Sequence, residues 1–328
     1  MGAKTGLYLN RKEPTDMIEK ILLDTDIGTD IDDAIVMSYL LKQKKCEIVG
    51  ITVTGGETEK RAALASVMCH AAGKPDIPIY PGPNQPLFVK QKECFAPQSK
   101  ILDSWEHQSV FPKGQAIEFM RKTIRENPGE ITLLAIAPLT NVALLFATDP
   151  EIPSLLKRLV LMGGRFSNFE SVLTDNVDKA FVPEHTDPII CNGALEMNAL
   201  IDPHATAIVY KANVPVHRSI GIDMTHRVTM PMEEFRSRFT DPLQKPIVDM
   251  SKHWISERTS VTFHDPLAAL TIFNDKICTF TRGDIAVELA SEKLQGYTYW
   301  NKSIDGKHEW ADSVDTDEFF KEYFSVFE

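Results

Sequence analysis

Short apolar runs alternate with segments of helical spacing along the first half of the chain. The runs at 21–23, 47–53, 131–135 and 158–162 are rich in Ile, Leu and Val, which is typical of buried strands. Segments with helical spacing follow them, listed in chain order as 33–44, 58–72 and 139–147. This alternation predicts βαβ units, and therefore an α/β fold with an open, mostly parallel, Rossmann-like sheet that has helices on both faces.

Two longer stretches, 80–114 and 165–195, interrupt the alternation. The first contains five prolines, and the second is polar without clear periodicity. Because long loops in a compact domain are commonly lids or binding loops, we expect both to line the active site. We expect one domain over 1–328, with residues 1–19 as an N-terminal extension. A final helix is predicted over 315–327, where aromatic residues share one face.

Composition narrows the classes of protein that the chain can belong to. Its 328 residues include 35 Lys and Arg against 46 Asp and Glu, a net charge of −11. This acidic balance argues against a nucleic-acid partner, because phosphate binding needs a basic surface. No apolar run approaches the roughly 20 residues of a membrane-spanning helix, so no membrane partner is expected.

The cysteines and the N-terminal residues indicate the cellular compartment of the protein. Five cysteines are scattered without a Cys-x-x-Cys pair, which favours free thiols in a reducing compartment over structural zinc. The first residues lack the apolar stretch of a signal peptide. We therefore expect a cytoplasmic protein by default, although a secretion signal removed ahead of residue 1 would leave no trace in this sequence.

Five aspartates follow the first predicted strand within ten residues: Asp24, Asp26, Asp30, Asp32 and Asp33. Carboxylates this crowded repel one another, and leaving them without a counter-charge would destabilise the fold. A solvated turn with a helix N-cap would explain Asp30 and Asp32 but not Asp24 and Asp26, which lie beside an apolar strand. Since Ca²⁺ and Mg²⁺ both favour carboxylate oxygens, the segment predicts a site for a hard cation.

An Asp-x-Asp pair after a strand also resembles phosphotransferases of the haloacid dehalogenase type. In those enzymes Thr or Val normally stands two residues beyond the second Asp, whereas this chain has Gly28 there. A metal-dependent phosphatase is therefore the weaker alternative.

Six segments, taken in order, resemble the inosine–uridine-preferring nucleoside hydrolase family. That family begins with a strand and an Asp-x-Asp-x-Gly-x-Asp-Asp cluster, and residues 24–34 are similar to it with two extra residues before the final Asp pair. The other similar segments are 51–56, 138–141, 162–164, 196–203, and 221–226 with 264–266. The resemblance covers roughly 20–327 and implies the nucleoside hydrolase fold, with Ca²⁺-dependent hydrolysis of ribonucleosides to base and ribose.

The resemblance also implies how the metal would be held. Asp26 would bind Ca²⁺ and act as general base toward a water at the metal, which the ion orients and acidifies. Asp33 and Asp265 would be further ligands, joined by the main-chain carbonyl of Ile136. Asp24 would order the cluster without binding the ion.

The substrate contacts follow from the same resemblance. The residues implied to hold the ribose are Asp32, its rival Asp30, Glu196, Asn198, Asn192 and Asp265. His264 is the candidate general acid, because a histidine with a pKa near 6.5 can protonate the departing base at neutral pH. We expect structural roles for Asp223, Thr225 and His226.

The chain departs from the family where the base and the 5′ end of a nucleoside would lie. Gly56 replaces an Asn that helps to hold the sugar, and the segment 165–195 differs in length. Trp105, His107 or Phe111 are candidates to stack on the base. Because the matching segments contain no arginine for a 5′-phosphate, nucleosides are expected to be better substrates than nucleotides. The sequence does not choose among purine, pyrimidine and modified bases.

Two further expectations concern partners and alternatives. Family members are commonly dimers or tetramers, so a homo-oligomer is expected here. The altered segments also leave open a catalytically altered protein that binds ribose or nucleosides without hydrolysing them.

Overall fold

The computed structural model describes residues 18–92, 95–166, 196–254 and 258–328. In this part of the chain a nine-stranded sheet has the order β10-β9-β11-β6-β5-β4-β1-β2-β3, and β7 (Thr229–Pro231) pairs with β8 (Ser260–Thr262) in a separate small sheet. The strands of the large sheet are β1 (Glu19–Thr25), β2 (Cys46–Val53), β3 (Ile79–Pro81), β4 (Ile131–Ala135), β5 (Arg158–Met162), β6 (His217–Ile220), β9 (Cys278–Val287), β10 (Thr298–Lys302) and β11 (His308–Val314).

The pairing confirms a mostly parallel sheet. β1 is parallel to both β2 and β4, and the parallel arrangement continues through β5, β6 and β11. β9 runs antiparallel to β11 and to β10, so one edge of the sheet is an antiparallel addition. Such an edge is common in large sheets of this kind.

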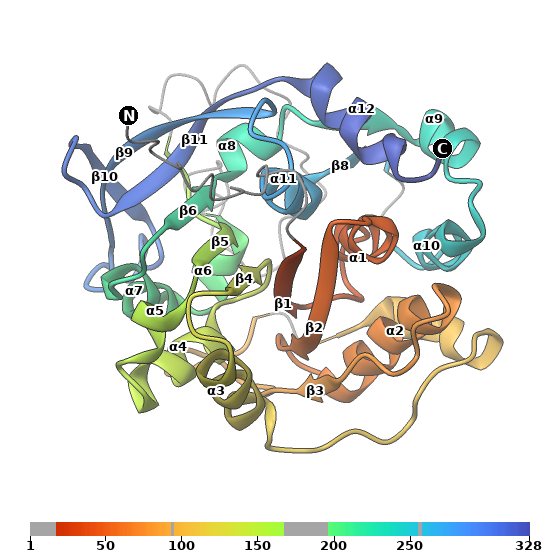
Figure 1. The fold of residues 1–328 in the computed structure, drawn as a ribbon, viewed down its shortest axis with the longest axis horizontal. Coiled ribbons are helices and arrows are strands. Elements are labelled where there is room, and N and C mark those ends of the chain that lie inside the picture. The colour runs from red at the N-terminus through yellow and green to blue at the C-terminus, as the bar shows by residue number, and fades with distance from the viewer. Residues whose placement is uncertain (1–17, 93–94, 167–195, 255–257) are drawn as a thin grey trace, which may run out of the picture.

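Helices cover both faces of the sheet, as the alternating pattern predicts (Figure 1). They are α1 (Asp32–Lys42), α2 (Thr58–Ala71), α3 (Ala116–Glu126), α4 (Thr140–Thr148), α5 (Ile152–Leu155), α6 (Met197–Ile201), α7 (Pro203–Lys211), α8 (Ile222–Thr225), α9 (Met232–Arg238), α10 (Lys245–Ser251), α11 (His264–Leu270) and α12 (Thr316–Ser325), with the 3-10 helices η2 (Pro97–Ser104) and η5 (Pro242–Gln244). The helices predicted at 33–44, 58–72, 139–147 and 315–327 are all present, as α1, α2, α4 and α12.

Alternation along β1 explains why the sheet needs cover on both sides. Ile21 and Leu23 belong to the hydrophobic cluster packed under α1, α2 and α11, whereas Leu22 belongs to the cluster under α3, α4 and α7. All three side chains are fully buried. A strand buried on both faces reads as one continuous apolar run, which is the pattern that marked it in the sequence.

The order of the strands places a crevice at the end of β1. From β1 the chain proceeds to β2 and β3 on one side, and later to β4, β5 and β6 on the other. Open α/β sheets bind ligands outside the carboxyl ends of the strands, at the point where the order reverses. Asp26 follows β1 and Ile136 follows β4, so both lie at this switch point.

The two long stretches have different outcomes. Residues 80–114 contain the end of β3 and η2, so this stretch is partly helical. The stretch 167–195, and with it Asn192, lies outside the described residues, so the expectations about them stay untested. Among the described cysteines, Cys46, Cys69 and Cys278 are free thiols.

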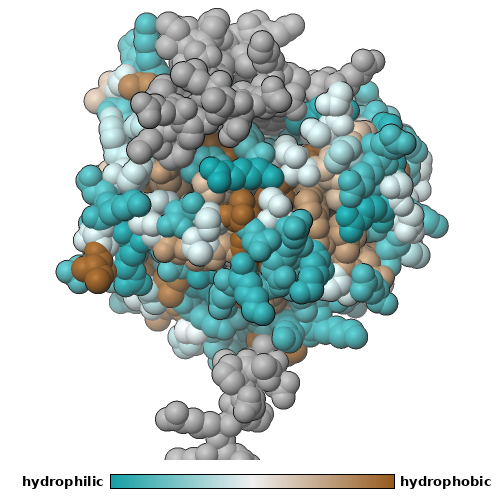
Figure 2. Space-filling view, turned by 90° about the horizontal axis from the view of Figure 1, so that it is seen from above, coloured by the Kyte–Doolittle hydropathy of each residue, from teal (hydrophilic) through white to brown (hydrophobic). Residues whose placement is uncertain are grey.

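Within the described ranges, no helix is both long enough and apolar enough to cross a membrane. Hydrophilic residues dominate the face shown in Figure 2, and the apolar residues visible there form small groups among them.

Candidate active site

Three buried carboxylates from two helix N-termini meet at the carboxyl end of the sheet. Asp32 and Asp33 lie in the first turn of α1, and Asp265 lies in the first turn of α11. A side-chain oxygen from each of the three lies within 4.8 Å of the others, and the residues are only 2%, 3% and 5% exposed. The positive end of each helix dipole favours these negative groups, but it does not neutralise three of them.

The electrostatics of this cluster fit a divalent cation. Burial raises the pKa of all three carboxyl groups well above the ordinary value, and repulsion from neighbouring aspartates raises each further. Two oxygens that bind one Ca²⁺ at about 2.4 Å can be at most about 4.8 Å apart, so the observed spread suits a single ion. A cation there would supply the missing counter-charge.

Short bonds tie Asp33 to the loop that follows β1. The hydroxyl of Thr25 donates to Asp33 Oδ1 (2.5 Å), and the backbone N–H of Asp26 donates to the same oxygen (3.2 Å). The charge of Asp26 acts on both Asp33 and Asp265, which places its carboxylate beside the cluster. The structure therefore gathers Asp33 and Asp265 of the expected ligands with Asp32, whereas Asp26 lies nearby without being one of the three carboxylates within 4.8 Å of one another.

Asp24 lies beneath the cluster, between β1, β2 and α4. Its Oδ1 accepts hydrogen bonds from the Thr52 hydroxyl (2.6 Å) and from Asn141 Nδ2 (2.7 Å). Its Oδ2 is buried without a partner among the described residues. Burial raises the pKa of Asp24 to about 7, and the two hydrogen bonds only partly oppose this. The backbone N–H of Ile136 donates to the carbonyl of Asp24 (2.9 Å), which fixes the turn after β4.

The two rival aspartates are held differently. Asp32 Oδ2 accepts the backbone N–H of Asp265 (3.0 Å), which locks the α1 and α11 termini together. Asp30 instead accepts the N–H of Ile31 (2.6 Å) and lies 3.6 Å from the guanidinium of Arg258. Asp32 is thus within the carboxylate cluster, whereas Asp30 is engaged with a cation at its rim.

Arg258 corrects one premise of the sequence reasoning. Its guanidinium is stacked on the ring of Trp254 (4.3 Å), pairs with Asp30, and acts on His264. The matching segments contain no arginine, but the fold brings one to the site from outside them. The preference for nucleosides over nucleotides cannot therefore be argued from the absence of arginine.

His264 begins α11, beside the carboxylates. Its Nδ1 lies 2.7 Å from the Thr225 hydroxyl, and its ring meets the ring of His226 edge-on, with centroids 5.3 Å apart. Burial, with the nearby charges of His226 and Arg258, holds the pKa of His264 well below its usual range. This direction argues against the expectation that His264 titrates near neutral pH, which did not include burial of the ring. Thr225 and His226, expected to be structural, contact the candidate acid directly.

The pair implied to hold the ribose is placed on α6. Glu196 is the N-cap of this helix, and its carboxylate accepts three backbone N–H groups, those of Gly164, Asn198 and Ala199. Asn198 Nδ2 donates to the Met162 carbonyl (3.1 Å) and approaches the Ile136 carbonyl (3.4 Å). Both side chains therefore lie across the ends of β4 and β5, next to the expected main-chain ligand.

All three candidates to stack on a base have other contacts in this structure. The Trp105 indole N–H donates to Asp249 on α10 (3.1 Å), and Phe111 is buried in the hydrophobic cluster under α2. His107 bonds the carbonyl of Trp105 (2.7 Å).

Two residues that no motif singled out also reach the site. Arg61 on α2 and Gln98 on η2 are both fully buried against the aspartate loop. For Arg61 the sequence holds a signal, because this arginine shares the spacing of Leu64, Ala65 and Met68 on the apolar side of the predicted helix. For Gln98 no comparable signal exists.

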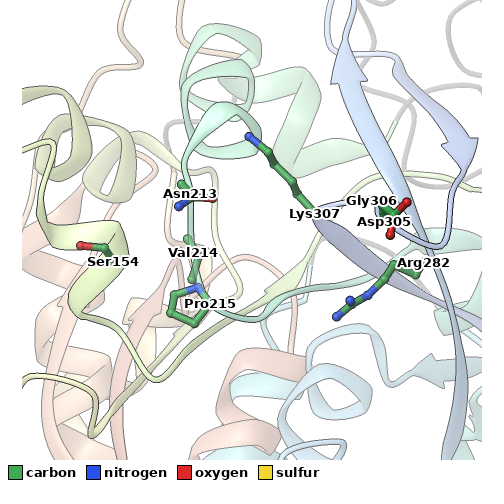
Figure 3. Close-up of a pocket in the computed structure, with 8 residues that line it drawn as sticks. All are labelled: Ser154, Asn213, Val214, Pro215, Arg282, Asp305, Gly306 and Lys307. Atoms are coloured by element: carbon green, nitrogen blue, oxygen red, sulfur yellow. The ribbon is translucent and has the colours of Figure 1, made fainter.

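A cavity lies at the end of the sheet opposite the carboxylate cluster. This open cavity of about 290 Å³ is lined by Ser154, Asn213, Val214, Pro215, Arg282, Asp305, Gly306 and Lys307. Pro215 lies two residues before β6 and Lys307 directly before β11, so the cavity borders the amino ends of these parallel strands. In Figure 3, Ser154 and Arg282 stand on its two sides. It is thus separate from the carboxylate cluster.

Comparisons with known proteins agree with this geometry. The model of the family described as inosine-uridine preferring nucleoside hydrolase matches residues 21–321. Uridine nucleosidase 1 of Arabidopsis thaliana is 27% identical, over 87% of this chain and 84% of its own length. A pyrimidine-specific ribonucleoside hydrolase of Salmonella enteritidis is 27% identical, over 85% and 87%.

Solved structures support the fold. A plant nucleoside hydrolase superposes with a TM-score of 0.77 at 22% identity, covering 94% of this chain and 98% of the other. A purine-preferring ribonucleoside hydrolase from Gardnerella vaginalis gives a TM-score of 0.74 at 22% identity, with the same coverage.

Proposed function

Because the chain belongs to the inosine-uridine preferring nucleoside hydrolase family, we propose that its carboxylate cluster binds Ca²⁺ and directs the hydrolysis of ribonucleosides. The chain is an N-ribosyl hydrolase of a metal-dependent family. The observation that carries the proposal is the convergence of Asp32, Asp33 and Asp265 within 4.8 Å at the switch point of the sheet. Without a cation, three buried carboxylates this close would repel one another and destabilise the fold.

We assign the metal to the carboxylates of Asp26, Asp33 and Asp265 and to the carbonyl of Ile136. When bound, the ion supplies Lewis-acid chemistry: it lowers the pKa of a water and orients the ribose hydroxyls. Asp26 then accepts the proton of the attacking water. Its position on the loop after β1, beside Asp33, supports this role. Carboxylates around the ribose also stabilise the positive charge that develops on the sugar in the transition state.

For the ribose we choose Asp32 over Asp30. Asp32 lies inside the carboxylate cluster and is fixed by the N–H of Asp265, whereas Asp30 is engaged by Arg258. Asn198 presents its amide beside the Ile136 carbonyl. Glu196 uses two of about four carboxylate acceptor positions on the α6 cap and one on the N–H of Gly164, which leaves one for a sugar hydroxyl.

His264 is the proposed donor to the departing base. Because burial keeps the ring neutral at pH 7, it offers one N–H. When the Thr225 hydroxyl donates to Nδ1, the ring proton sits on Nε2, the nitrogen that we assign to the departing base. To protonate the base, the ring takes a proton from solvent when substrate binds, and as imidazolium it passes the Nε2 proton to the departing base and returns to the neutral form.

The test is ribose release from uridine, cytidine, inosine, adenosine and guanosine, measured with and without stripping of Ca²⁺ by EGTA. We expect Ca²⁺-dependent release, with uridine first, because the similar enzymes from Arabidopsis and Salmonella act on uridine and on pyrimidine ribonucleosides, as their names state. Asp26→Asn and Asp265→Asn should reduce release by about 10³-fold or more. Asp317→Asn, an exposed carboxylate on α12, is the matched control.

The outcomes separate the competing functions. Release that is unaffected by EGTA would refute the metal assignment. Tight ribose binding without release would instead favour the nucleoside-binding protein. Phosphate release from simple esters would favour the phosphatase. The expected homo-oligomer stays a prediction, which light scattering of the purified protein would check.

A further inference from the structure

The loop at 26–30 carries two of the aspartates and is buried against its neighbours. Ile27 is 0% and Thr29 6% exposed, so the main-chain carbonyls of this loop need hydrogen-bond donors from the protein. The five consecutive carbonyl oxygens from Asp26 to Asp30 all accept hydrogen bonds, and among the described residues the donors are Arg61 and Gln98.

The division between the two donors is regular. Arg61 Nη1 donates to the carbonyls of Asp26 and Ile27, the latter at 3.2 Å. The backbone N–H of Gln98 donates to the Gly28 carbonyl (3.2 Å), and its side-chain Nε2 donates to those of Thr29 (3.1 Å) and Asp30 (2.8 Å). The whole loop is thus held through its backbone, independently of its carboxylates.

The remaining N–H groups of Arg61 tie the loop to two other segments. Nε donates to the Gly56 carbonyl (2.8 Å), and Nη2 donates to the Gly55 carbonyl (2.9 Å), the Thr29 hydroxyl (3.0 Å) and the Phe95 carbonyl (3.3 Å). The guanidinium of Arg61 makes no ion pair among the described residues and is fully buried. Its positive charge acts instead across the loop on Asp33.

Neighbouring side chains pack closely against the loop at Gly28. Gly28 has φ +123°, and a Cβ there would come within 2.8 Å of Leu64 Cδ1 and 3.1 Å of Ala96 Cβ. The turn into α2 is fastened to the same segment, because the Glu57 carboxylate accepts the N–H of Ala96 (2.8 Å). The loop is therefore enclosed between α2 and η2.

We propose that Arg61 and Gln98 are positioning residues that set the metal affinity of the site by clamping the aspartate loop, an inference that rests on the proposed function. The loop has two residues more than the family pattern before its final Asp pair, so it has more conformational freedom to lose. The clamp removes that freedom before the ion binds. Neither residue belongs to the proposed metal or substrate contacts.

The test measures Ca²⁺ binding to EGTA-stripped protein by calorimetry, well below the unfolding temperature of each variant. Arg61→Met removes the charge and every donor, Gln98→Met removes the side-chain donor without changing charge, and Arg61→Lys keeps the charge with fewer donors. Arg125→Met, an exposed arginine, and Lys100→Met, on the exposed side of η2, are the matched controls. Circular dichroism confirms that each variant is folded.

We expect Ca²⁺ to bind about 10–100-fold more weakly to Arg61→Met and Gln98→Met, with Arg61→Lys intermediate and both controls unchanged. At saturating Ca²⁺ the KM for uridine should return close to the wild-type value, which a damaged substrate site would not allow. Should Arg61→Met fail to fold, Gln98→Met and Arg61→Lys decide the question.

Folded variants that bind Ca²⁺ as tightly as the wild-type protein would overturn the inference and leave only a structural role. That result is distinct from failure of the proposed function, in which the wild-type protein itself would neither bind Ca²⁺ nor release ribose.

Discussion

Acid should destabilise this protein through His217, far from the proposed metal site. The ring is 2% exposed at the start of β6, where it stacks on Tyr210 (centroids 5.1 Å apart) and meets His308 edge-on (4.7 Å). Its nitrogens lack a well-formed hydrogen bond among the described residues. Burial, reinforced by His308, lowers the pKa of His217 from 6.5 to about 3.

The sign and size of the effect follow from proton linkage. Above pH 6.5 the ring is neutral in both states, so it contributes no pH dependence. As the pH falls below 6.5, the unfolded chain binds the proton first, and the free energy of unfolding decreases until the pH reaches about 3. The loss amounts to about 2 kcal/mol at pH 5 and approaches about 5 kcal/mol at the acid limit.

The perturbation is His217→Phe, which keeps an aromatic ring against Tyr210 and cannot be protonated. Urea unfolding at pH 8 and pH 5 should show that the variant loses about 2 kcal/mol less than the wild-type protein between these pH values. Any packing defect in the variant would lower the free energy of unfolding equally at pH 8 and pH 5. The change between the two pH values therefore reports protonation of His217 alone.

Tyr210→Phe is the matched control in the same cluster. It removes the hydroxyl that lies 3.0 Å from Ser219 Oγ but no group that titrates between pH 5 and pH 8. It should therefore lower stability without changing its pH dependence. If His217→Phe shows the same loss between pH 8 and pH 5 as the wild-type protein, the reasoning from burial is refuted.

Three further predictions concern the site. Gly82→Ala should lower the free energy of unfolding by about 1–3 kcal/mol, measured in urea, because its Cβ would stand 2.1 Å from Asn141 Oδ1; full stability would contradict the packing. Thr225→Val should lower kcat about 10-fold at nearly constant KM, and Thr225→Ser should retain activity, because only the hydroxyl holds the His264 ring. Stripping Ca²⁺ should lower the melting temperature reversibly, with about 2.7 kcal/mol recovered at a Ca²⁺ concentration 100 times Kd; an unchanged melting temperature would argue against a buried ion.

The central strands were predictable because their surroundings are simple. The runs at 131–135 and 158–162 are β4 and β5 with the same bounds. Both strands are covered on two faces, so apolar residues occupy nearly every position and the pattern does not depend on distant neighbours. The antiparallel edge formed by β9 and β10 was not predicted, because half of its side chains face solvent and its pairing depends on distant strands.

The candidate site was predictable only as a set of residue types. The ordered motifs pointed to Asp26, Asp33 and Asp265 as ligands, and the fold gathers Asp32, Asp33 and Asp265 within 4.8 Å of one another. Burial could not be inferred, and it is burial that keeps His264 neutral at pH 7. Arg258 and Gln98 were missed because neither stands in a periodic segment or a motif that marks its function.

By itself the sequence determined the parallel sheet, the helices that cover it and the aspartate-rich segment at the end of β1, because these depend on local periodicity and on neighbouring residues. Only the tertiary structure decided which carboxylates share a site. Asp32 and Asp265 are 233 positions apart in the sequence, and they meet because the N-termini of α1 and α11 lie side by side. The tertiary structure also decided how the loop is held. Arg61 and Gln98 donate to main-chain carbonyls, which every residue has, so the sequence of the loop does not indicate these hydrogen bonds.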